Sequence, residues 1–372
     1  MKVLVDVTTW TSGRTGIGLY TERLLRAMES LGHDDEMLLA SNGDMAGIDV
    51  AGRCLGPKMP LRALWMQTAM AAHGLRQRPD IAFYPNYMAP LVRTCPTVVT
   101  VHDLAVFIHP ETFTFKKRVL QRALLPTIIR RADAILTPSE STRRDILTRV
   151  DVDPAKVVAI HLAADPAFHQ PIDDDQAQQL RERLQLPDRY LLAVGTLEPR
   201  KNLVRLISAF ERVHEQDPDI RLLLVGGKGW RDAAIRAVLE GSSAAAAIDA
   251  LGYIDFSTLR VLYSDALALC YPSLYEGFGL PVVEAMASGT PVLVSRGSSL
   301  DEVAQEAALK VDALDVDEIA AGLLRLVGDS ELRDRLRDLG LKRARSLSWR
   351  KTAERTREVF ERVAQGRPPN AS

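Results

Sequence analysis

The segment EGFGLPVVE at residues 276–284 places two carboxylates, Glu276 and Glu284, eight positions apart on either side of a glycine-rich turn. An apolar run, ALALCYP (266–272), precedes this segment, which opens a helical run ending at residues 287–289. The order predicts a strand, a glycine turn and the start of a helix. Pro281 suits the first helical position, where its missing N–H costs nothing.

A helix start of this kind turns backbone N–H groups outward, where they attract an anion. The expected N–H donors are those of Gly277, Phe278, Gly279 and Leu280. Glu276 would lie before the turn and Glu284 about one turn into the helix, so the two carboxylates would reach opposite ends of a ligand with phosphate between them. A sugar nucleotide has this shape. The alternative is structural, with Glu284 a first-turn acid favoured by the helix dipole and Glu276 a loop residue.

The segment resembles the Glu-x7-Glu motif of retaining glycosyltransferases of family 4, and the resemblance extends over almost the whole chain. It implies an α/β protein of the GT-B fold, with two Rossmann-like, doubly wound domains that face each other across a cleft. The N-terminal acceptor-binding domain is expected over 1–170 and the C-terminal donor-binding domain over 171–348. The resemblance also implies that the last helix, within 349–365, crosses back onto the first domain, and the polar stretch 166–188 is expected to be the junction.

Composition agrees with a two-domain soluble protein. The chain has 372 residues, which is too long for one ordinary core. Of these residues 47% are hydrophobic and 26% are charged, as is normal for a soluble globular protein. A net charge of −1 gives no global attraction to nucleic acid or to membranes. The three cysteines are widely spaced and form no metal or disulfide pattern, which indicates a reducing cytoplasm. We expect no signal peptide and no membrane-spanning segment.

Short apolar runs alternate with amphipathic segments in both halves of the chain, as in parallel sheets with crossover helices. Helices are expected over 17–31 and 202–213, and the segment SLDE (299–302) fits a capping box with Ser299 as the cap. The expected strands are 2–7, 81–85, 97–102, 134–139 and 157–162 in the first half, and 190–195, 221–227, 266–272 and 290–295 in the second.

The segment GTLEPRKN (195–202) lies between an expected strand and an expected helix, so Arg200 and Lys201 would lie at the carboxyl end of that strand. Two cations beside a helix N-terminus form a pyrophosphate site, because the arginine offers a bidentate fork and the lysine a point charge. The pair matches the Arg-Lys pair of the resembled family. The alternative is a solvated cationic pair after a turn.

A glycine-rich loop with Gly13, Gly16 and Gly18 follows the first strand and lets the backbone approach a ligand. The resemblance places Gly16 and Gly18 near the donor phosphates. Such a loop would also suit a dinucleotide, but the strict G-x-G-x-x-G spacing is missing, as is the acidic residue that would bind the ribose of NAD. Turn geometry alone is the structural alternative.

Two further segments follow expected strands of the first half. The resemblance places His102 beside the donor sugar, on the acceptor side, and Asp103 would orient His102 or contact the acceptor. Ser139 and Glu140 resemble the family's Ser-Glu element and are further acceptor-side candidates, although an N-cap explains Ser139 equally well. A satisfied structural histidine is the alternative for His102.

The sequence contains no convincing metal-binding motif. Asp-x-Asp occurs at 151–153, 173–175 and 315–317, each time in a polar context that suggests a turn or a helix cap. A GT-A glycosyltransferase would need such a pair for a divalent cation directly after a buried strand. We therefore expect no metal and no cofactor.

Residues 113–131 combine apolar and basic side chains, and a basic amphipathic helix of this kind can lie on anionic lipid. Pro126 is expected to kink or end the helix. Peripheral contact with the inner face of the cell membrane is one interpretation of this segment. The other is a helix that packs on its own sheet and leaves a solvated basic face.

The resemblance implies a metal-independent, retaining hexosyltransferase in which Arg200 and Lys201 hold the diphosphate, Glu284 the ribose, and Glu276 the transferred sugar. The donor is expected to be GDP-mannose or a related GDP-sugar, with a UDP-sugar as the alternative. The acceptor is expected to be a glycan or lipid-linked glycan of polysaccharide, O-antigen or lipopolysaccharide biosynthesis. Competing functions are a sugar-nucleotide 2-epimerase of the same fold, a non-catalytic GT-B scaffold subunit and, third, a nicotinamide dehydrogenase.

Overall fold

The computed structural model describes residues 1–10, 16–43, 50, 52–55, 59, 61–229 and 232–370. The chain forms two compact units. Unit 1 comprises the described residues of Met1–Leu104, Val119–Leu162 and Ser348–Ser372, and unit 2 comprises those of Ala105–Arg118 and Ala163–Leu347.

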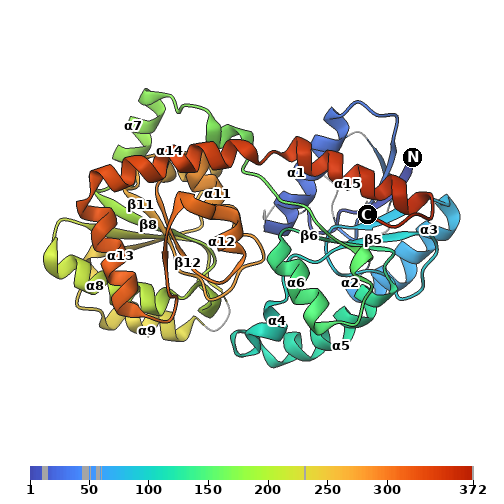
Figure 1. The fold of residues 1–372 in the computed structure, drawn as a ribbon, viewed down its shortest axis with the longest axis horizontal. Coiled ribbons are helices and arrows are strands. Elements are labelled where there is room, and N and C mark those ends of the chain that lie inside the picture. The colour runs from blue at the N-terminus through green and yellow to red at the C-terminus, as the bar shows by residue number, and fades with distance from the viewer. Residues whose placement is uncertain are drawn as a thin grey trace. The chain divides into compact units, whose positions relative to one another are not determined.

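Unit 1 is built on a parallel sheet whose described strands follow the order β3-β2-β1-β4-β5-β6-β7. Figure 1 labels β5 and β6 of this sheet. The strands are β1 (Lys2–Asp6), β2 (Glu36–Ala40), β3 (Arg53–Leu55), β4 (Ile81–Tyr84), β5 (Thr97–Thr100), β6 (Ala134–Thr137) and β7 (Val157–Ala159). The helices are α1 (Gly16–Ser30), α2 (Arg62–Trp65), η1 (Met66–Met70), α3 (Ala71–Gln77), most of α5 (Phe115–Arg131), α6 (Glu140–Arg149), η3 (Pro154–Lys156) and α15 (Trp349–Ala364).

Unit 2 has a parallel sheet with the described order β10-β9-β8-β11-β12-β13. Its strands are β8 (Tyr190–Val194), β9 (Arg221–Val225), β10 (Ile248–Gly252), β11 (Ala268–Tyr271), β12 (Val292–Ser295) and β13 (Ala308–Val311). Its helices are α4 (Ala105–Ile108), η2 (Pro110–Thr112), η4 (Pro166–His169), α7 (Asp174–Leu184), η5 (Pro199–Lys201), α8 (Leu203–Gln216), α9 (Ala233–Gly241), η6 (Ala245–Ala247), α10 (Phe256–Asp265), α11 (Leu280–Ala287), α12 (Ser299–Ala304), η7 (Gln305–Ala307), α13 (Val316–Gly328) and α14 (Ser330–Ser346).

The fold class expected from the sequence is confirmed: both units are α/β, with parallel sheets and crossover helices. Strands β4, β5, β6, β11 and β12 are buried along their whole length, which explains their continuous apolar runs. In unit 2, helices α8 and α13 lie side by side, as do α11 and α14 (Figure 1). Their apolar faces and the central strands enclose the core of the unit.

Two local expectations need correction. Pro126 does not end its helix, because α5 continues to Arg131. The stretch 166–188 is not only a junction, because it contains η4 and the helix α7, which packs against α10 in unit 2. Asp173 caps α7 by accepting a hydrogen bond from the backbone N–H of Gln176, so the helix begins within this stretch.

Helix α15 packs against α1 of unit 1 although the two lie at opposite ends of the chain. The rings of Phe83 and Phe360 lie 5.0 Å apart between their centroids. The guanidinium of Arg357 donates to the carboxylate of Asp35 at 2.8 Å. Aromatic packing and an ion pair thus hold the last helix on the first sheet.

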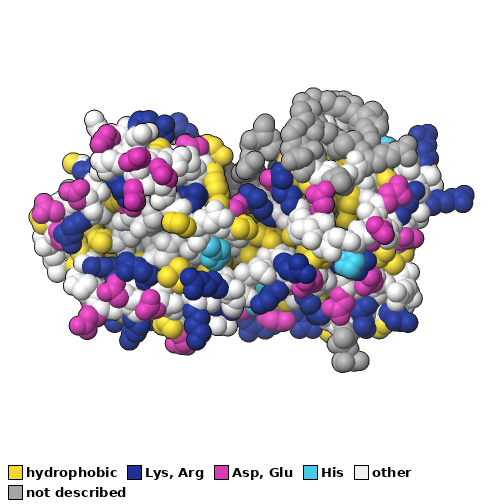
Figure 2. Space-filling view, turned by 90° about the horizontal axis from the view of Figure 1, so that it is seen from above, with side chains coloured by type: hydrophobic (Ala, Val, Ile, Leu, Met, Phe, Trp, Pro, Cys, Tyr) yellow, Lys and Arg dark blue, Asp and Glu magenta, His cyan; other side chains and the backbone are white. Residues whose placement is uncertain are grey.

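In each sheet the strand order reverses once, between β1 and β4 in unit 1 and between β8 and β11 in unit 2. At such a reversal the connections leave in opposite directions, and the loops after the two strands open a crevice in which ligands bind. On the face drawn in Figure 2, cationic and anionic side chains are interspersed. Within the described ranges, no helix combines the length and the apolar character needed to cross a membrane.

Candidate functional site

The loops that follow β8 and β9 run close together at the carboxyl edge of the unit 2 sheet. The backbone N–H of Gly195 donates to the carbonyl of Val225 at 2.8 Å, and that of Leu197 donates to the carbonyl of Gly227 at 3.0 Å. A Cβ atom at Gly226, whose φ is +149°, would lie 2.0 Å from the carbonyl oxygen of Gly195. The two loops therefore need glycine where they meet.

Arg200 and Lys201 belong to the short 3-10 helix η5 between β8 and α8. Asn202 ends η5 in the left-handed region, with φ at 59°, and its amide donates to the carbonyls of Pro272 and Ala313 at 2.9 and 2.6 Å. These bonds fix the turn in an uncommon backbone conformation. Both cations consequently lie at the carboxyl end of β8, as the sequence predicted.

The loop after β11 brings Glu276 to both cations. One carboxylate oxygen of Glu276 lies 2.7 Å from Nη1 of Arg200, and the other lies 2.7 Å from Nζ of Lys201. Because β8 and β11 are the neighbours at the reversal in strand order, this cluster occupies the position where a sheet of this topology binds ligands.

The cluster is buried, and the charges within it shift the pKa values of Glu276 and Lys201. Burial alone would raise the pKa of Glu276, but Arg200 and Lys201 oppose it and hold that pKa at about 2. Burial lowers the pKa of Lys201, although the carboxylate of Glu276 counteracts the effect. Glu276 is thus ionised at neutral pH.

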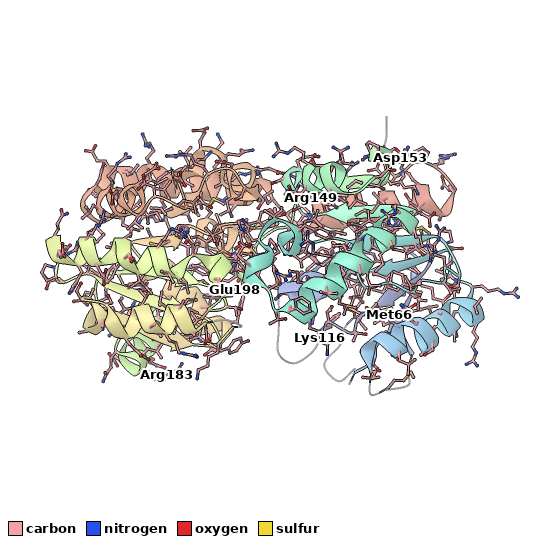
Figure 3. All side chains as sticks on the ribbon, turned by 90° about the horizontal axis from the view of Figure 1, so that it is seen from below. Met66, Lys116, Arg149, Asp153, Arg183 and Glu198 are labelled. Atoms are coloured by element: carbon pink, nitrogen blue, oxygen red, sulfur yellow. The ribbon has the colours of Figure 1, made fainter. Side chains whose placement is uncertain are left out.

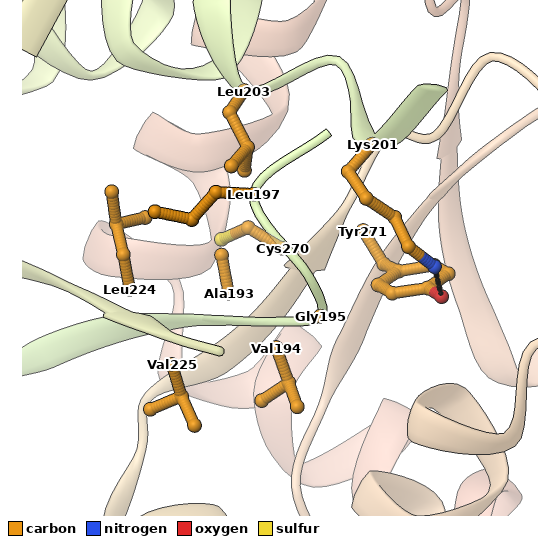
Figure 4. A pocket seen from close by; sticks show the side chains of 10 residues that line it. All are labelled: Ala193, Val194, Gly195, Leu197, Lys201, Leu203, Leu224, Val225, Cys270 and Tyr271. Carbon is orange, nitrogen blue, oxygen red and sulfur yellow. Dashed lines mark hydrogen bonds between the residues drawn. The ribbon is translucent and has the colours of Figure 1, made fainter. Parts of the chain in front are cut away.

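Two members of this cluster were missed in the sequence. Glu198, the N-cap of η5 and only 2% exposed, accepts a hydrogen bond of 2.6 Å from Nη2 of Arg200, and Figure 3 labels it. Tyr271, the last residue of β11, accepts a hydrogen bond of 2.5 Å from Nζ of Lys201, drawn as a dashed line in Figure 4. Tyr271 and Lys201 also line a cavity of about 10 Å³ beneath the turn. Glu198 is two residues from its partner Arg200, in the segment already singled out, whereas Tyr271 is 70 residues from Lys201 and no local motif connects them.

Helix α11 begins as expected, with one difference in register. Gly279 is the N-cap and has a φ of +96°, and a Cβ atom there would lie 2.4 Å from Leu300 Cδ2. Leu280 is therefore the first helical residue, and Pro281 is the second residue and not the first. Phe278 is buried, and both Gly277 and Phe278 have interactions of their own within the chain.

The capping box expected with Ser299 as the cap was wrong by one residue. Ser298 is the N-cap of α12 and accepts a hydrogen bond from the backbone N–H of Leu300, while Asp301, not Glu302, accepts from Gly297. The hydroxyl of Ser299 is thereby left to donate to the backbone carbonyl of Glu276 at 2.8 Å. Ser299 supports the position of Glu276, a contact that the sequence did not suggest.

Glu284 lies on the buried face of α11. The hydroxyl of Tyr263 donates to its carboxylate at 3.1 Å. Burial raises the pKa of Glu284 to about 7, the charge of Asp165 adds to that rise, and the hydrogen bond from Tyr263 opposes it. The two glutamates of the motif therefore differ in ionisation, because Glu276 has two cations beside it and Glu284 has none among these partners.

His102 follows β5 in unit 1. Its Nε2 lies 2.8 Å from the carbonyl oxygen of Pro85, and its ring meets that of Tyr20 edge to face at a centroid distance of 4.8 Å. Burial lowers the pKa of His102, so the ring is neutral at pH 7. Because a carbonyl only accepts, Nε2 carries the proton and Nδ1 presents a lone pair. This tautomer can accept a proton or a hydrogen bond.

The other first-half candidates have varied surroundings. Ser139 is fully buried and caps α6 by accepting from Thr142 N at 3.0 Å, so the capping role is observed. Glu140 is exposed and forms an ion pair with Arg143. Asp103 is half-buried and follows His102 directly. Gly16 and Gly18 belong to the first turn of α1, whereas Gly13 lies outside the described residues.

The aspartate pairs act as helix caps, as the sequence predicted. Asp153, Asp173 and Asp315 accept hydrogen bonds from backbone N–H groups at the starts of η3, α7 and α13. Within the part of the chain that the structure describes, no group of three or more His, Cys, Asp or Glu side chains is arranged to hold a metal ion.

Two family models match the chain. Residues 174–343 match the glycosyl transferases group 1 model, and residues 14–168 match the glycosyltransferase family 4 model. Together the matches contain the cluster of Arg200, Lys201 and Glu276, and also His102.

Two relatives are similar in sequence. The O-antigen chain mannosyltransferase B of Escherichia coli is 32% identical over 293 residues, which cover 78% of this chain and 76% of the relative. The O-antigen chain mannosyltransferase RfbU of Salmonella typhimurium is 30% identical over 61% of this chain and 59% of its own length.

Solved structures show the same fold at low sequence identity. Sucrose-phosphate synthase from Thermosynechococcus elongatus has a TM-score of 0.77 at 21% identity, over 98% of this chain and 99% of the other. HepE of Anabaena, in complex with UDP and glucose, has a TM-score of 0.76 at 16% identity, over 97% of this chain and 99% of the other.

Proposed function

Since the chain belongs to the group 1 glycosyltransferases of family 4, we propose that it transfers a hexose from a nucleoside-diphosphate sugar to a glycan or lipid-linked glycan. The transfer retains the anomeric configuration and proceeds without a metal ion. The observation that carries the proposal is the joint placement of Arg200, Lys201 and Glu276 at the reversal in strand order of unit 2.

Arg200 and Lys201 are proposed to bind the diphosphate. Nζ of Lys201 donates to Tyr271 and Glu276, and an ammonium group has three donors, so it retains one N–H for a phosphate oxygen. Charge on the departing diphosphate develops during transfer, and preorganised cations stabilise such charge strongly in a buried site. In this proposal, the cationic side chains of Arg200 and Lys201 stabilise the negative charge of the departing diphosphate.

The reaction is proposed to follow a front-face route. The bond between the anomeric carbon and the diphosphate oxygen breaks, and the acceptor oxygen forms its bond on the same face. The departing phosphate takes the proton of the acceptor hydroxyl. Glu276 is proposed to lie beside the transferred sugar near its reacting carbon, and the backbone of residues 277–280 to help hold the diphosphate. Gly16 and Gly18, in the first turn of α1, are proposed to contribute to the same donor site.

Glu284 is proposed to accept hydrogen bonds from the ribose hydroxyls, which requires its ionised form. Because its pKa in the free protein is about 7, affinity for the donor nucleotide should rise about tenfold per pH unit below pH 7 and level off above it. Isothermal titration between pH 5.5 and 8.5 measures this slope, and Glu284→Gln should remove it.

The same variant gives a control through stability. In the ligand-free protein Glu284 keeps its proton up to about pH 7, whereas in the unfolded chain it ionises from about pH 4.5, so the free energy of unfolding falls by about 3 kcal/mol between these pH values. In urea titrations, the free energy of unfolding of Glu284→Gln should therefore increase relative to that of wild type as the pH rises across that window. An unchanged binding slope in Glu284→Gln would assign the pH dependence to another group, such as the phosphate itself.

The favoured donor is GDP-mannose or a related GDP-sugar. The support is the similarity to two O-antigen chain mannosyltransferases, which also supports a role in polysaccharide or lipopolysaccharide biosynthesis. A UDP-sugar is the second donor class to test, because a protein of the same fold is known in complex with UDP and glucose.

His102 is proposed to line the acceptor side, where the lone pair on Nδ1 can accept a hydrogen bond from an acceptor hydroxyl. Asp103, Ser139 and Glu140 are further acceptor-side candidates. Buried Ser139 already caps α6, so among these three Asp103 and Glu140 are the better placed to meet a ligand.

Contact with an anionic membrane through residues 113–131 is part of the proposal. Helix α5 carries basic residues and no acidic ones, and Phe115, Val119 and Leu120 are exposed, Phe115 by 73%. Figure 3 labels Lys116 in its first turn. Flotation with vesicles of phosphatidylglycerol, compared with phosphatidylcholine alone, tests the contact. Equal recovery with both would remove it.

A donor panel tests the proposed function. Thermal shift and donor hydrolysis are measured with GDP-, UDP-, ADP- and dTDP-sugars, each with and without EDTA. A donor at about 100 times its Kd stabilises the folded protein by about 2.7 kcal/mol, so one nucleotide should raise the Tm clearly. An effect that EDTA abolishes would contradict metal independence. A folded protein that responds to no donor, with or without acceptor, would favour a scaffold role.

A further inference from the structure

Residues 105–118 belong to unit 2, although the residues before and after them in the chain belong to unit 1. We call this segment the clip. It contains α4 and η2, and a single residue, Leu104, separates it from His102 and Asp103. Its residues Ala105, Val106 and Phe113 are buried, which is unusual for a connection that carries so little regular structure.

The clip is buried against one side chain of the donor-site loop. Ala105, Val106 and Phe113 form a separate apolar cluster with Tyr275, which is 6% exposed. The ring of His109 lies 6.2 Å from that of Tyr275 between centroids. Tyr275 lies in the loop between β11 and α11. The clip therefore packs against a residue of that loop.

The backbone of Tyr275 contacts the cation cluster. Its carbonyl accepts a hydrogen bond of 2.8 Å from Nη1 of Arg200, the same nitrogen that lies 2.7 Å from Glu276. In return, the backbone N–H of Leu274 donates to the carbonyl of Arg200 at 2.9 Å. The loop that carries Tyr275 and the turn that carries Arg200 are therefore joined at two points.

We propose that the clip is a positioning element for the diphosphate site: by holding the ring of Tyr275, it sets the place of the Tyr275 carbonyl and thereby the direction of the Arg200 guanidinium. Phe113 and Val106 are its positioning residues. This inference rests on the proposed function of Arg200 as a diphosphate ligand. It adds that a segment of the first half of the sequence controls donor binding in unit 2.

The physical reason is the directionality of the arginine fork. A guanidinium binds phosphate through two parallel N–H groups, so a small rotation costs more than it would for a lysine. A loop that loses its apolar support relaxes into the space left by the missing side chain. The backbone carbonyl of Tyr275 moves with it, and a displacement on the order of 1 Å is enough to weaken catalysis or binding strongly.

The experiment compares Phe113→Ala and Val106→Ala with wild type in binding GDP and guanosine, or UDP and uridine if the donor panel selects uracil. Both variants should bind the nucleoside diphosphate about tenfold more weakly and the nucleoside as wild type does, because only the phosphates meet Arg200. Phe113→Leu, which refills most of the space, should restore the ratio of the two affinities. Val327→Ala, at a buried valine of α13 outside the cluster, is the matched control and should not change the ratio.

The outcomes separate the inference from its premise. If wild type binds nucleoside and nucleoside diphosphate equally, Arg200 and Lys201 are not diphosphate ligands and both claims fail. If wild type prefers the diphosphate and Val106→Ala, folded by circular dichroism, keeps that preference, the clip inference alone is overturned. A loss of both affinities in parallel would also overturn it, since general loosening of unit 2 would then be the cause.

Discussion

Lys201→Ala should lower kcat/KM for the nucleoside-diphosphate sugar by about a thousandfold, on the order of 4 kcal/mol of transition-state stabilisation. The ammonium of Lys201 lies 2.7 Å from Glu276 and 2.5 Å from the hydroxyl of Tyr271, which fix it in a buried place. A cation held in advance needs no reorganisation when charge develops on the diphosphate. Steady-state transfer assays at several donor concentrations measure the effect.

The loss should appear in both kcat and donor KM, because the cation meets the diphosphate before and during transfer. Lys342→Ala serves as the control, since Lys342 is an exposed lysine of α14. Lys201→Arg should not restore activity, because a planar fork does not replace a compact ammonium group in a buried place. Activity within a few fold of wild type in Lys201→Ala would exclude Lys201 from the donor site.

Glu276→Gln should lower kcat by at least about a hundredfold and yet bind the nucleoside diphosphate no more weakly than wild type. In the ligand-free protein the two oxygens of Glu276 engage Arg200 and Lys201 at 2.7 Å each. An incoming diphosphate must share these cations with the carboxylate. Removing the charge of Glu276 ends that competition. It also removes the carboxylate that is proposed to lie beside the transferred sugar.

The two readouts are therefore expected to move apart: single-turnover rates fall, whereas the Kd for the nucleoside diphosphate stays level or decreases. Glu331→Gln, at an exposed glutamate of α14, is the matched control. A parallel loss of binding and turnover in Glu276→Gln would show that the carboxylate serves only to hold the cations in place.

Stability adds a third readout on the same variant. The pKa of Glu276 is about 2 in the folded protein against an ordinary 4.5, so its ionised form stabilises the fold above pH 4.5 by about 3 kcal/mol. That contribution disappears as the pH falls from 4.5 toward 2. The difference in free energy of unfolding between wild type and Glu276→Gln should shrink over this window.

Nine strands were predicted from the sequence because each is a short apolar run bounded by turn residues. The strands that were missed are β2, β3, β10 and β13. β10 and β13 lie at the edges of their sheet and are mostly half-buried, so polar residues such as Asp249 and Lys310 interrupt their pattern. β3 has three residues, and the sequence of β2, EMLLA, favours a helix on propensity alone. All four segments are strands because they pair with neighbouring strands of their sheets, which the local sequence does not reveal.

The candidate site divides in the same way. Arg200, Lys201 and Glu276 were expected to share one site because each follows a strand, and the carboxyl ends of parallel strands meet at one edge. Glu198 and Tyr271 escaped notice because their partners are side-chain atoms whose direction depends on the left-handed turn at Asn202 and on the packing of β11. A sequence pattern places a residue at the end of a strand but does not orient its atoms.

The contact between the loops after β8 and β9 has a consequence for directed evolution. A methyl group at Gly226 would lie 2.0 Å from a backbone oxygen, and one at Gly229 would lie 2.4 Å from the carbonyl oxygen of Leu197. Gly227, between them, has no atom within 4 Å of its Cβ position. Libraries meant to change which sugar nucleotide this protein accepts should therefore randomise Gly227 and leave its two neighbouring glycines untouched, because variants at those two positions would be lost to misfolding before selection for a new donor could act.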